Sequence, residues 1–202
     1  MKYILASSSP RRKRLLSGFD MNVECVEHLF DETSVFLNNS PEEYCQDISK
    51  GKANSVSNIY KESVIISADT IVLLDNTVLE KPKNKLEAID MLQLLSDREH
   101  SVITSVTIIC KIRKVDFSFQ EKTIVRFNKI NIDMIEYYVE KYNPLDKSGS
   151  YGIQDFSSIF VKSIDGCFFN VVGLPLATLF YHLKRLKLVR FSLNTKNRIN
   201  KL

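Results

Sequence analysis

The chain has 202 residues, of which 44% are hydrophobic and 26% are charged, and this composition suits one folded domain with a single core. The formal net charge is +4, but from Lys184 onward there are seven basic residues and no acid, so residues 1–183 hold 21 basic and 24 acidic residues. Because the excess positive charge belongs to the end of the chain, we do not expect a nucleic-acid partner.

The cysteine pattern and the apolar pattern exclude two further classes. Four cysteines form no CxxC pair and three histidines form no HExxH pattern, so neither indicates a zinc site. Reduced thiols in a cytoplasmic protein are the simplest interpretation. The apolar run at Tyr3–Ala6 is too short for a signal-peptide core, and polar residues, Gly173 and Pro175 interrupt the stretch Cys167–Leu183, so we predict no contact with a membrane.

The first third of the chain alternates short apolar runs with helix-start signals. Tyr3–Ser7 predicts a buried strand, and Ser9, followed by proline, is typical of the N-cap of a helix that ends at Gly18. Asn22–Val26 predicts a weak strand. The same Ser-Pro pair at Ser40 predicts a second helix that runs past Lys52, although a glycine at position 51 weakens it.

Two β-rich runs, Val64–Ser67 and Ile71–Leu74, lie on either side of Ala68-Asp69-Thr70, which places Asp69 at the end of a predicted strand. A variant capping box beginning at Asn84 predicts a helix after these runs. The apolar stripe expected on this helix comprises Leu86, Ile89, Leu92 and Leu95.

The remaining elements alternate in the same way. Ser101–Ile112 and Phe117–Phe127 predict adjacent antiparallel strands, and Ile159–Ile164 with Phe168–Val172 predicts a hairpin around Asp165-Gly166. Two helices are predicted from stripes with helical spacing. The stripes are Ile135, Tyr138, Val139 and Tyr142, and then Leu176, Leu179, Phe180 and Leu183. We therefore predict an α/β fold with a mixed sheet, one domain over residues 1–188 and a basic tail over residues 189–202.

Four consecutive cations follow the serines and proline at the start of the first predicted helix, in Ser7-Ser8-Ser9-Pro10-Arg11-Arg12 and the two residues after it. The helix dipole disfavours positive charge there, so we expect an anion nearby. Free N–H groups, serine hydroxyls and arginine forks all suit a phosphate. A plain serine N-cap beside solvated arginines fits this segment equally well.

Other segments carry groups suited to the same chemistry. Asp69 can act as a general base or a metal ligand, and Lys81 before proline can reach a phosphate. Asp31-Glu32 offers oxygen ligands for Mg²⁺ or Mn²⁺, and Asp146–Gln154 offers an acid, a lysine and an amide in a glycine-rich turn. Each of these also fits an ordinary loop when taken alone. Together, cations and carboxylates in this number indicate phosphoryl chemistry with a divalent metal.

Five segments carry a family resemblance when they are read in order. They are LASSSPRR, SADTIV, EKP, LDKSGSYGIQ and NVVGLP. With them the chain resembles, from Leu5 to about Leu183, the Maf family of nucleoside triphosphate pyrophosphatases. The resemblance implies a twisted mixed β-sheet with flanking helices, in two lobes around a central cleft (the Maf/ITPase-like fold). It also implies hydrolysis of a nucleoside triphosphate between its α and β phosphates with a divalent metal, a homodimer, and a link to cell-division arrest.

The resemblance also assigns roles to individual residues. Asp69 is then the catalytic proton acceptor. The positions that match substrate and phosphate contacts are Ser8, Arg11, Arg12, Lys52, Thr70, Lys81, Lys147 and Gln154. The metal ligands are Glu32, Asp69 and Asp146. Arg11, Thr70 and Gln154 resemble the branch that acts on dTTP and UTP, whereas the 7-methyl-GTP branch typically has a bulky aromatic residue in place of the first.

Two alternatives stay open at this point. One is the same reaction on 7-methyl-GTP or another base, and the other is a nucleotide-binding regulator of cell division that does not turn over. An intact Asp69 argues against the second, because binding alone does not require a general base. The chain departs from the family pattern at Ser96-Asp97 and at Ser148, and both changes are small substitutions in turns.

Overall fold

A twisted mixed sheet forms the spine of the molecule in the computed structural model, which describes residues 1–19, 21–37 and 40–189. Within these residues the sheet has seven strands, namely β1 (Tyr3–Ala6), β2 (Val23–Val26), β3 (Val64–Leu74), β4 (Thr77–Leu79), β5 (Glu99–Cys110), β6 (Val115–Phe127) and β7 (Val161–Asp165). The order is β2-β1-β3-β5-β6-β7, with β4 paired to β3. The β2-β1-β3 pairs are parallel and the others are antiparallel.

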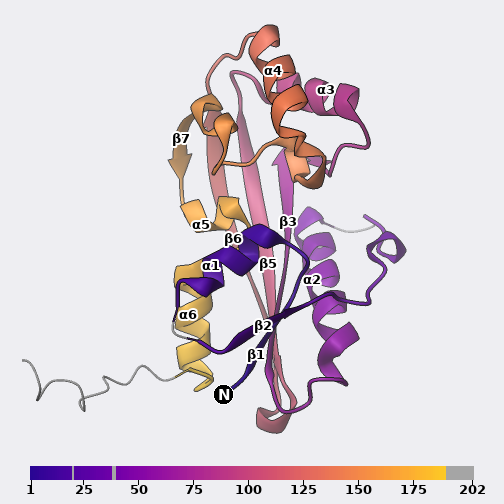
Figure 1. Cartoon of the computed structure of the whole chain (residues 1–202), viewed down its shortest axis with the longest axis vertical. Helices are drawn as coiled ribbons and strands as arrows, with labels where there is room; N and C mark the ends of the chain where they lie inside the picture. The colour runs from indigo at the N-terminus through magenta and orange to yellow at the C-terminus, as the bar shows by residue number, and fades with distance from the viewer. Residues whose placement is uncertain (20, 38–39, 190–202) are drawn as a thin grey trace, which may run out of the picture.

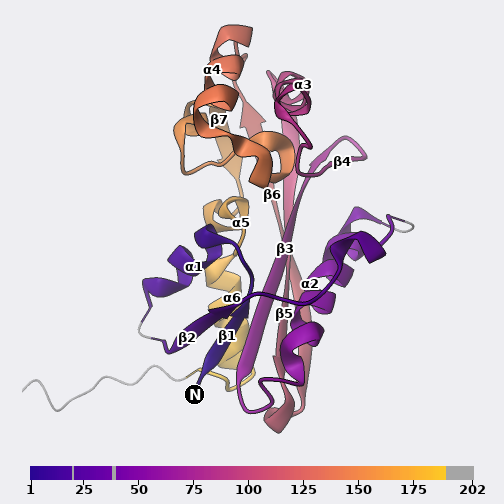
Figure 2. The same cartoon turned by 45° about the vertical axis from the view of Figure 1, so that its right-hand side comes forward.

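The helices divide the molecule into two lobes along the sheet (Figure 1). They are α1 (Pro10–Ser17), α2 (Pro41–Ser57), α3 (Lys85–Leu95), α4 (Ile132–Tyr142), α5 (Phe168–Val172) and α6 (Leu176–Arg185). In the lower lobe α1 and α6 cover one face of the sheet and α2 covers the other (Figure 2). The upper lobe holds α3, α4, β4 and β7, together with the turns of residues 143–160 (Figure 1). The long strands β3, β5 and β6 pass through both lobes.

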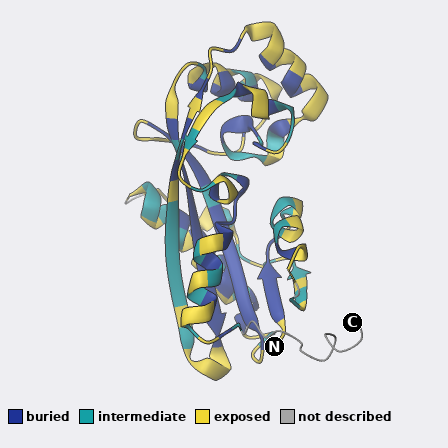
Figure 3. Ribbon diagram, turned by 90° about the vertical axis from the view of Figure 1, so that its left-hand side faces the viewer, coloured by how far each residue is buried: buried dark blue, intermediate teal, exposed yellow. Residues whose placement is uncertain are grey.

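Side-chain alternation along β3 explains how one strand serves several cores. Val64, Ile66 and Ala68 pack with the α1 and α6 side, whereas Ile65 packs with α2 on the opposite face. Farther along, Val72 joins the core of the upper lobe. Figure 3 shows the central strands buried over most of their length, with exposed residues gathered on the outer helices and turns. A strand buried on both faces is apolar at most positions, and β3 follows this pattern on either side of residues 67–70.

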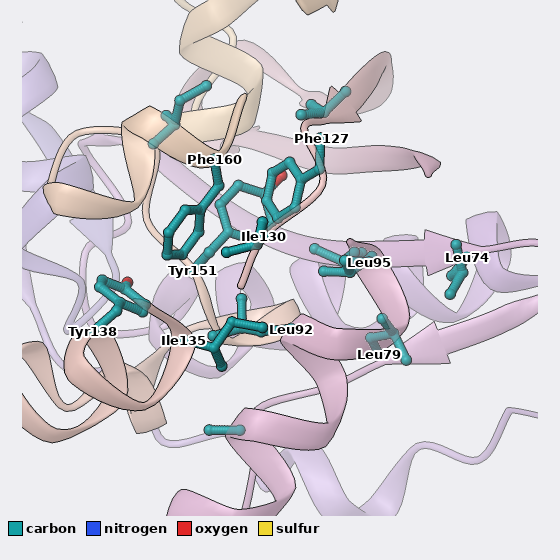
Figure 4. Close-up of a cluster of buried hydrophobic side chains, with 14 of the residues drawn as sticks. Leu74, Leu79, Leu92, Leu95, Phe127, Ile130, Ile135, Tyr138, Tyr151 and Phe160 are labelled. Carbon is teal, nitrogen blue, oxygen red and sulfur yellow. The ribbon is translucent and has the colours of Figure 1, made fainter. Parts of the chain in front are cut away.

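The core of the upper lobe is built around aromatic side chains from separate segments (Figure 4). Phe127, Tyr138, Tyr151 and Phe160 pack with leucines from α3, including Leu92. The Phe127 ring lies edge-on to the rings of Tyr151 and Phe160, with centroids 4.9 Å and 6.1 Å away. This packing holds the segment that contains Tyr151 in place beside the sheet.

The sequence prediction is wrong where it divides residues 64–74 into two strands with Asp69 at an end. β3 is continuous, because β5 pairs with it at every position from Ile65 to Leu73. The small or polar residues of Ala68-Asp69-Thr70 interrupt the apolar pattern but not the backbone hydrogen bonds. Asp69 therefore lies in the middle of a strand.

The predicted hairpin of Ile159–Ile164 with Phe168–Val172 is also wrong. Residues 161–165 form β7, which pairs with β6, and residues 168–172 form the short helix α5. The buried Asn170 explains the helix, because its amide donates to the carbonyl of Val102 and to the hydroxyl of Thr123. Gly173, at φ 117°, then ends the helix in the left-handed conformation that favours glycine.

The buried face of α3 differs from the apolar stripe that the sequence predicts for this helix. Leu86 is 74% exposed, whereas Ala88, Met91, Leu92 and Leu95 are buried. Alanine gives a weak apolar signal, which hid the true face. Of the other stripes, Leu176, Leu179 and Leu183 are buried as expected, but Tyr142 is exposed.

The end of the described part of the chain packs against the core. Leu188 is buried, and its carbonyl accepts a hydrogen bond from the hydroxyl of Tyr3 at 2.7 Å. The predicted basic tail over residues 189–202 lies, apart from Val189, outside the described residues. None of the helices in the described ranges is both long and apolar enough to cross a bilayer.

Candidate functional site

A cavity of about 230 Å³ lies beside the part of β3 that has no paired strand on one edge. β1 pairs with β3 only as far as Ile66, and β4 begins to pair at Val72, so residues 67–71 face neither strand on that edge. Asp69 and Thr70 lie in this gap and line the cavity. The hydroxyl of Ser148 donates to the free carbonyl of Thr70 at 3.1 Å, which satisfies part of the exposed backbone.

The structure brings every site residue predicted from the sequence to this one cavity. Those that line it are Ser8, Arg11, Arg12, Glu32, Lys52, Asp69, Thr70, Lys81, Asp146, Lys147 and Gln154. The residues up to Lys52 come from the lower lobe, and those from Asp146 onward come from the upper lobe. The cavity is therefore a cleft between the lobes, as the resemblance implied.

A buried lysine joins two carboxylates on the α2 side of the cleft. Lys52 Nζ lies 2.8 Å from Asp69 Oδ1 and 3.0 Å from Glu32 Oε2, and its side chain is only 5% exposed. A hydrogen bond from His28 lowers the pKa of Glu32 to about 2. Burial of the carboxylate acts in the opposite direction, and the positive charge of Lys52 lowers the pKa further. Both carboxylates therefore compensate the ammonium charge that would otherwise be costly to bury.

Arg12 is held on the opposite face of β3. Its Nε donates to the carbonyl of Gly173 at 2.7 Å, and its Nη2 donates to the hydroxyl of Thr70 at 2.8 Å. Thr70 is in turn hydrogen-bonded to Thr104. Burial lowers the pKa of the Arg12 guanidinium, and the charge of Asp69 acts in the opposite direction. The fork of donors is thus fixed by the loop before α6 and by β3 together.

A second group of charges bridges the lobes at the mouth of the cleft. Arg11 Nη1 lies 2.6 Å from Asp146 Oδ2, and Lys147 Nζ lies 2.7 Å from Asp146 Oδ1. Burial opposes ionisation of Asp146, but the hydrogen bonds from Lys147 and Arg11 prevail, so its pKa lies below the ordinary value. Asp146 therefore arranges two cations that face the cleft.

Two predicted site residues, a lysine and a serine, are exposed. Lys81 and Ser8 line the cleft from the segment after β4 and from the loop before α1. Ser9, by contrast, is used as the N-cap, since its hydroxyl accepts from the backbone N–H of Arg12. The serine-rich loop thus serves both predicted roles, one serine capping the helix and another facing the cleft.

The fit of a metal ion can be judged from the carboxylates. Among the described residues, no group of three or more acidic, histidine or cysteine side chains is close enough to hold a metal. Asp146 is engaged by two cations, whereas Glu32 and Asp69 share Lys52. Two carboxylates fit a magnesium-type ion, which commonly takes one or two protein carboxylates and completes its shell with water and substrate phosphates.

A second cavity of about 370 Å³ adjoins the first and shares Asp69, Thr70 and Lys81 with it. Its other walls include Tyr44, whose hydroxyl donates to Glu80 at 2.6 Å. The shared residues show that the two cavities meet at the open stretch of β3.

Gln154 lines the cleft from a segment that is anchored by Tyr151. The Tyr151 hydroxyl lies 2.7 Å from Nε2 of His100, and both side chains are buried. Burial lowers the pKa of His100 to about 4, so the imidazole is neutral near pH 7. This buried hydrogen bond fixes the start of the turn that presents Gln154.

Sequence reasoning missed three contributors to the cleft. His28 contacts Glu32 from four residues earlier, Ser148 binds the backbone of β3, and Gly173 offers its carbonyl to Arg12. The i, i+4 spacing of His28 and Glu32 predicts contact only in a helix, and residues 28–31 are not helical. The other two act through contacts between distant segments, which no local pattern reveals.

Comparison with known proteins places these features in a family. A family model described as Maf-like protein matches residues 2–186. A dTTP/UTP pyrophosphatase of Bacillus pumilus is 47% identical over 176 residues, which cover 86% of this chain and 90% of that protein. A dTTP/UTP pyrophosphatase of Clostridium botulinum is 45% identical over 177 residues, which cover 87% and 94%.

A solved structure supports the fold. The Staphylococcus aureus Ham1 protein has a TM-score of 0.52 and covers 92% of this chain and 99% of its own, at 13% sequence identity. Similarity at that level of identity is informative about the fold alone. The family model and the relatives at 40% identity and above go further, and they show that this chain belongs to the Maf-like protein family.

Proposed function

We propose that this chain hydrolyses dTTP and UTP to the monophosphate and pyrophosphate. The observation that carries the proposal is the buried Lys52–Asp69 pair, at 2.8 Å, in a cleft that also contains four other cations. The relatives named dTTP/UTP pyrophosphatase support the choice of substrate. Arg11 already has Asp146 as a partner, and a triphosphate would add the further negative charge that suits the cations at the start of α1.

Asp69 is the proposed general base. Lys52 holds its Oδ1, which leaves Oδ2 to accept a proton from the attacking water. Its place within a paired strand limits its movement, and a fixed carboxylate needs little reorganisation during the reaction. The water then attacks the α-phosphorus, and pyrophosphate leaves.

The cations stabilise charge as pyrophosphate departs. Arg12, Lys81 and Lys147 reach the cleft from three different segments, so they can surround a chain of phosphates. Removal of one preorganised stabiliser of this kind typically reduces kcat by about 10²–10³. Glu32 and Asp69 would hold Mg²⁺ or Mn²⁺, which supplies further neutralisation of phosphate charge when bound.

Base selection is assigned to the upper lobe. The hydroxyl of Thr70 is already engaged by Arg12 and Thr104, so we propose that Thr70 acts by holding Arg12. Gln154 offers a donor and an acceptor, which match the O4 and N3–H groups of uracil and thymine. Arg11 borders the same space beside Asp146.

The test is a substrate screen on purified protein with Mg²⁺ or Mn²⁺ and each common NTP and dNTP, with products separated by chromatography. The proposal expects monophosphate and pyrophosphate, with dTTP and UTP preferred. Nucleoside diphosphate and orthophosphate as primary products would contradict the reaction. A cytoplasmic location is part of the proposal, because Cys25, Cys45, Cys110 and Cys167 are all free thiols.

A further inference from the structure

Phe30 lies directly against helix α2 at Gly51. A Cβ atom at position 51 would overlap the Cζ atom and both Cε atoms of the Phe30 ring. Gly51 lies in the interior of a helix of 17 residues, where glycine is normally unfavourable. The missing side chain is what allows the ring to lie flat on the helix backbone.

The same turn of α2 anchors the residues on either side of Phe30. The backbone N–H of Leu29 donates to the hydroxyl of Ser55 at 3.1 Å, and that hydroxyl donates to the carbonyl of Lys52 at 2.8 Å. Two residues after Phe30, the carboxylate of Glu32 meets Lys52 at 3.0 Å. The loop before α2 is thus attached to the helix at positions 51, 52 and 55.

We propose that Phe30 and Gly51 are a positioning pair that holds Glu32 in the cleft, an inference that rests on the proposed function. Glu32 begins a short 3-10 helix (Glu32–Ser34), and its backbone is not part of the sheet. Phe30 lies two residues before Glu32 in the chain, and its apolar ring contacts α2. Displacement of the ring by a side chain at position 51 therefore moves Glu32 away from Lys52 and Asp69.

Stability and activity should respond to Gly51→Ala in opposite directions. Alanine is the better helix former, and this gain offsets the cost of displacing the ring. A shift of about 1 Å in a reacting group can reduce the rate by about 100-fold. A protein that is equally or more stable but slower would separate positioning from general structural damage.

The experiment measures the melting temperature and kcat/KM for dTTP in the wild type, in Gly51→Ala, in Phe30→Ala and in the double variant. Gly18→Ala is the matched glycine control, because a Cβ there meets nothing within 4 Å. Phe36→Ala is the matched aromatic control, because Phe36 belongs to the same loop and is 72% exposed. Both controls should keep wild-type kcat/KM.

The proposal expects Gly51→Ala to lower kcat/KM by about 10- to 100-fold with an unchanged or higher melting temperature. Because the overlap is with Phe30, Gly51→Ala should have no added effect in the Phe30→Ala background. Wild-type kcat/KM in Gly51→Ala, or an equal loss in both backgrounds, would overturn the pair. An inactive wild type with every nucleotide would instead refute the proposed function.

Discussion

Lys52 and Asp69 form an ion pair in the middle of the molecule, with Nζ 2.8 Å from Oδ1 and side chains that are 5% and 12% exposed. The lysine comes from α2 and the aspartate from β3, so the pair joins a helix to the sheet that it covers. Removing one partner of a buried pair leaves an uncompensated charge. Glu32, the second partner of Lys52, limits that cost here.

Asp69→Asn should abolish turnover while nucleotide binding and folding persist. Asparagine keeps the size of the side chain but loses its basicity, and Lys52 retains Glu32 as a partner. Steady-state rates and calorimetric titration with dTTP would measure the two properties separately. A variant that kept more than about a tenth of wild-type kcat would show that Asp69 is not the base.

Arg12→Lys should reduce kcat/KM by about 100-fold, although the charge is kept. The guanidinium donates from Nε to Gly173 and from Nη2 to Thr70, and an ammonium cannot reproduce this fork. Kinetics with dTTP would measure the effect, with Lys13→Arg on the same helix as the control. Near wild-type activity in Arg12→Lys would mean that only charge is needed at this position.

Acid should destabilise the wild type more than a His100→Gln variant. The pKa of His100 is about 4 in the folded state and lies near the ordinary histidine value of 6.5 in the unfolded state, so the unfolded chain binds the proton more readily between these values. The stability from neutral His100 is complete above about pH 6.5 and is lost as the pH falls toward 4.

Urea unfolding at pH 7.5 and pH 4.5 would measure this difference. The loss of unfolding free energy on acidification should be about 2 to 3 kcal/mol larger in the wild type. Glutamine can still bond the Tyr151 hydroxyl, and the other titrating groups are common to both proteins. Equal losses would show that His100 titrates normally in the fold.

Gln154→Ala should reduce base selectivity without changing the metal requirement. The wild type should prefer dTTP and UTP over 7-methyl-GTP by about tenfold in kcat/KM, because Arg11, Thr70 and Gln154 are too polar to stack well on a cationic guanine, which favours an aromatic face. The ratio of kcat/KM values in the two proteins is the measurement. A wild-type preference for 7-methyl-GTP, or an unchanged ratio in the variant, would refute the assignment.

A chain that ends at Leu188 should keep activity within about threefold. Leu188 is buried and its carbonyl accepts a hydrogen bond from Tyr3, so the truncated chain retains this core contact. The sequence after it has few apolar side chains to bury. A large fall in kcat with an unchanged melting temperature would show that the removed segment contributes to the site.

The sequence predicted which residues line the cleft better than it predicted how they are arranged. Ser9 and Pro10 predicted the start of α1, and the alternation of Ser101–Ile112 and Phe117–Phe127 predicted the long antiparallel pair, because these signals are local. The helix at Asn170 escaped detection, because its conformation is selected by hydrogen bonds to two other strands.

Lys52 illustrates what local patterns do not reveal. Its sequence surroundings resemble those of any solvated helix lysine, and only the arrival of Asp69 from β3 and Glu32 from the preceding loop explains its burial. The sequence predicts that Gly51 weakens the helix, whereas in the structure the absence of a side chain at this position makes room for the Phe30 ring. Both findings depend on contacts between segments that are separated in the sequence and meet only in the folded protein.

The continuity of β3 and β5 through both lobes has a consequence for how activity is lost on heating. Asp69 belongs to the hydrogen-bonded ladder that joins these strands, and that ladder supports the cores of both lobes. We therefore expect Asp69 to be part of the last unit to open, and its backbone amide should be among the slowest to exchange with deuterium. Thermal inactivation should coincide with the loss of the whole fold in one cooperative transition.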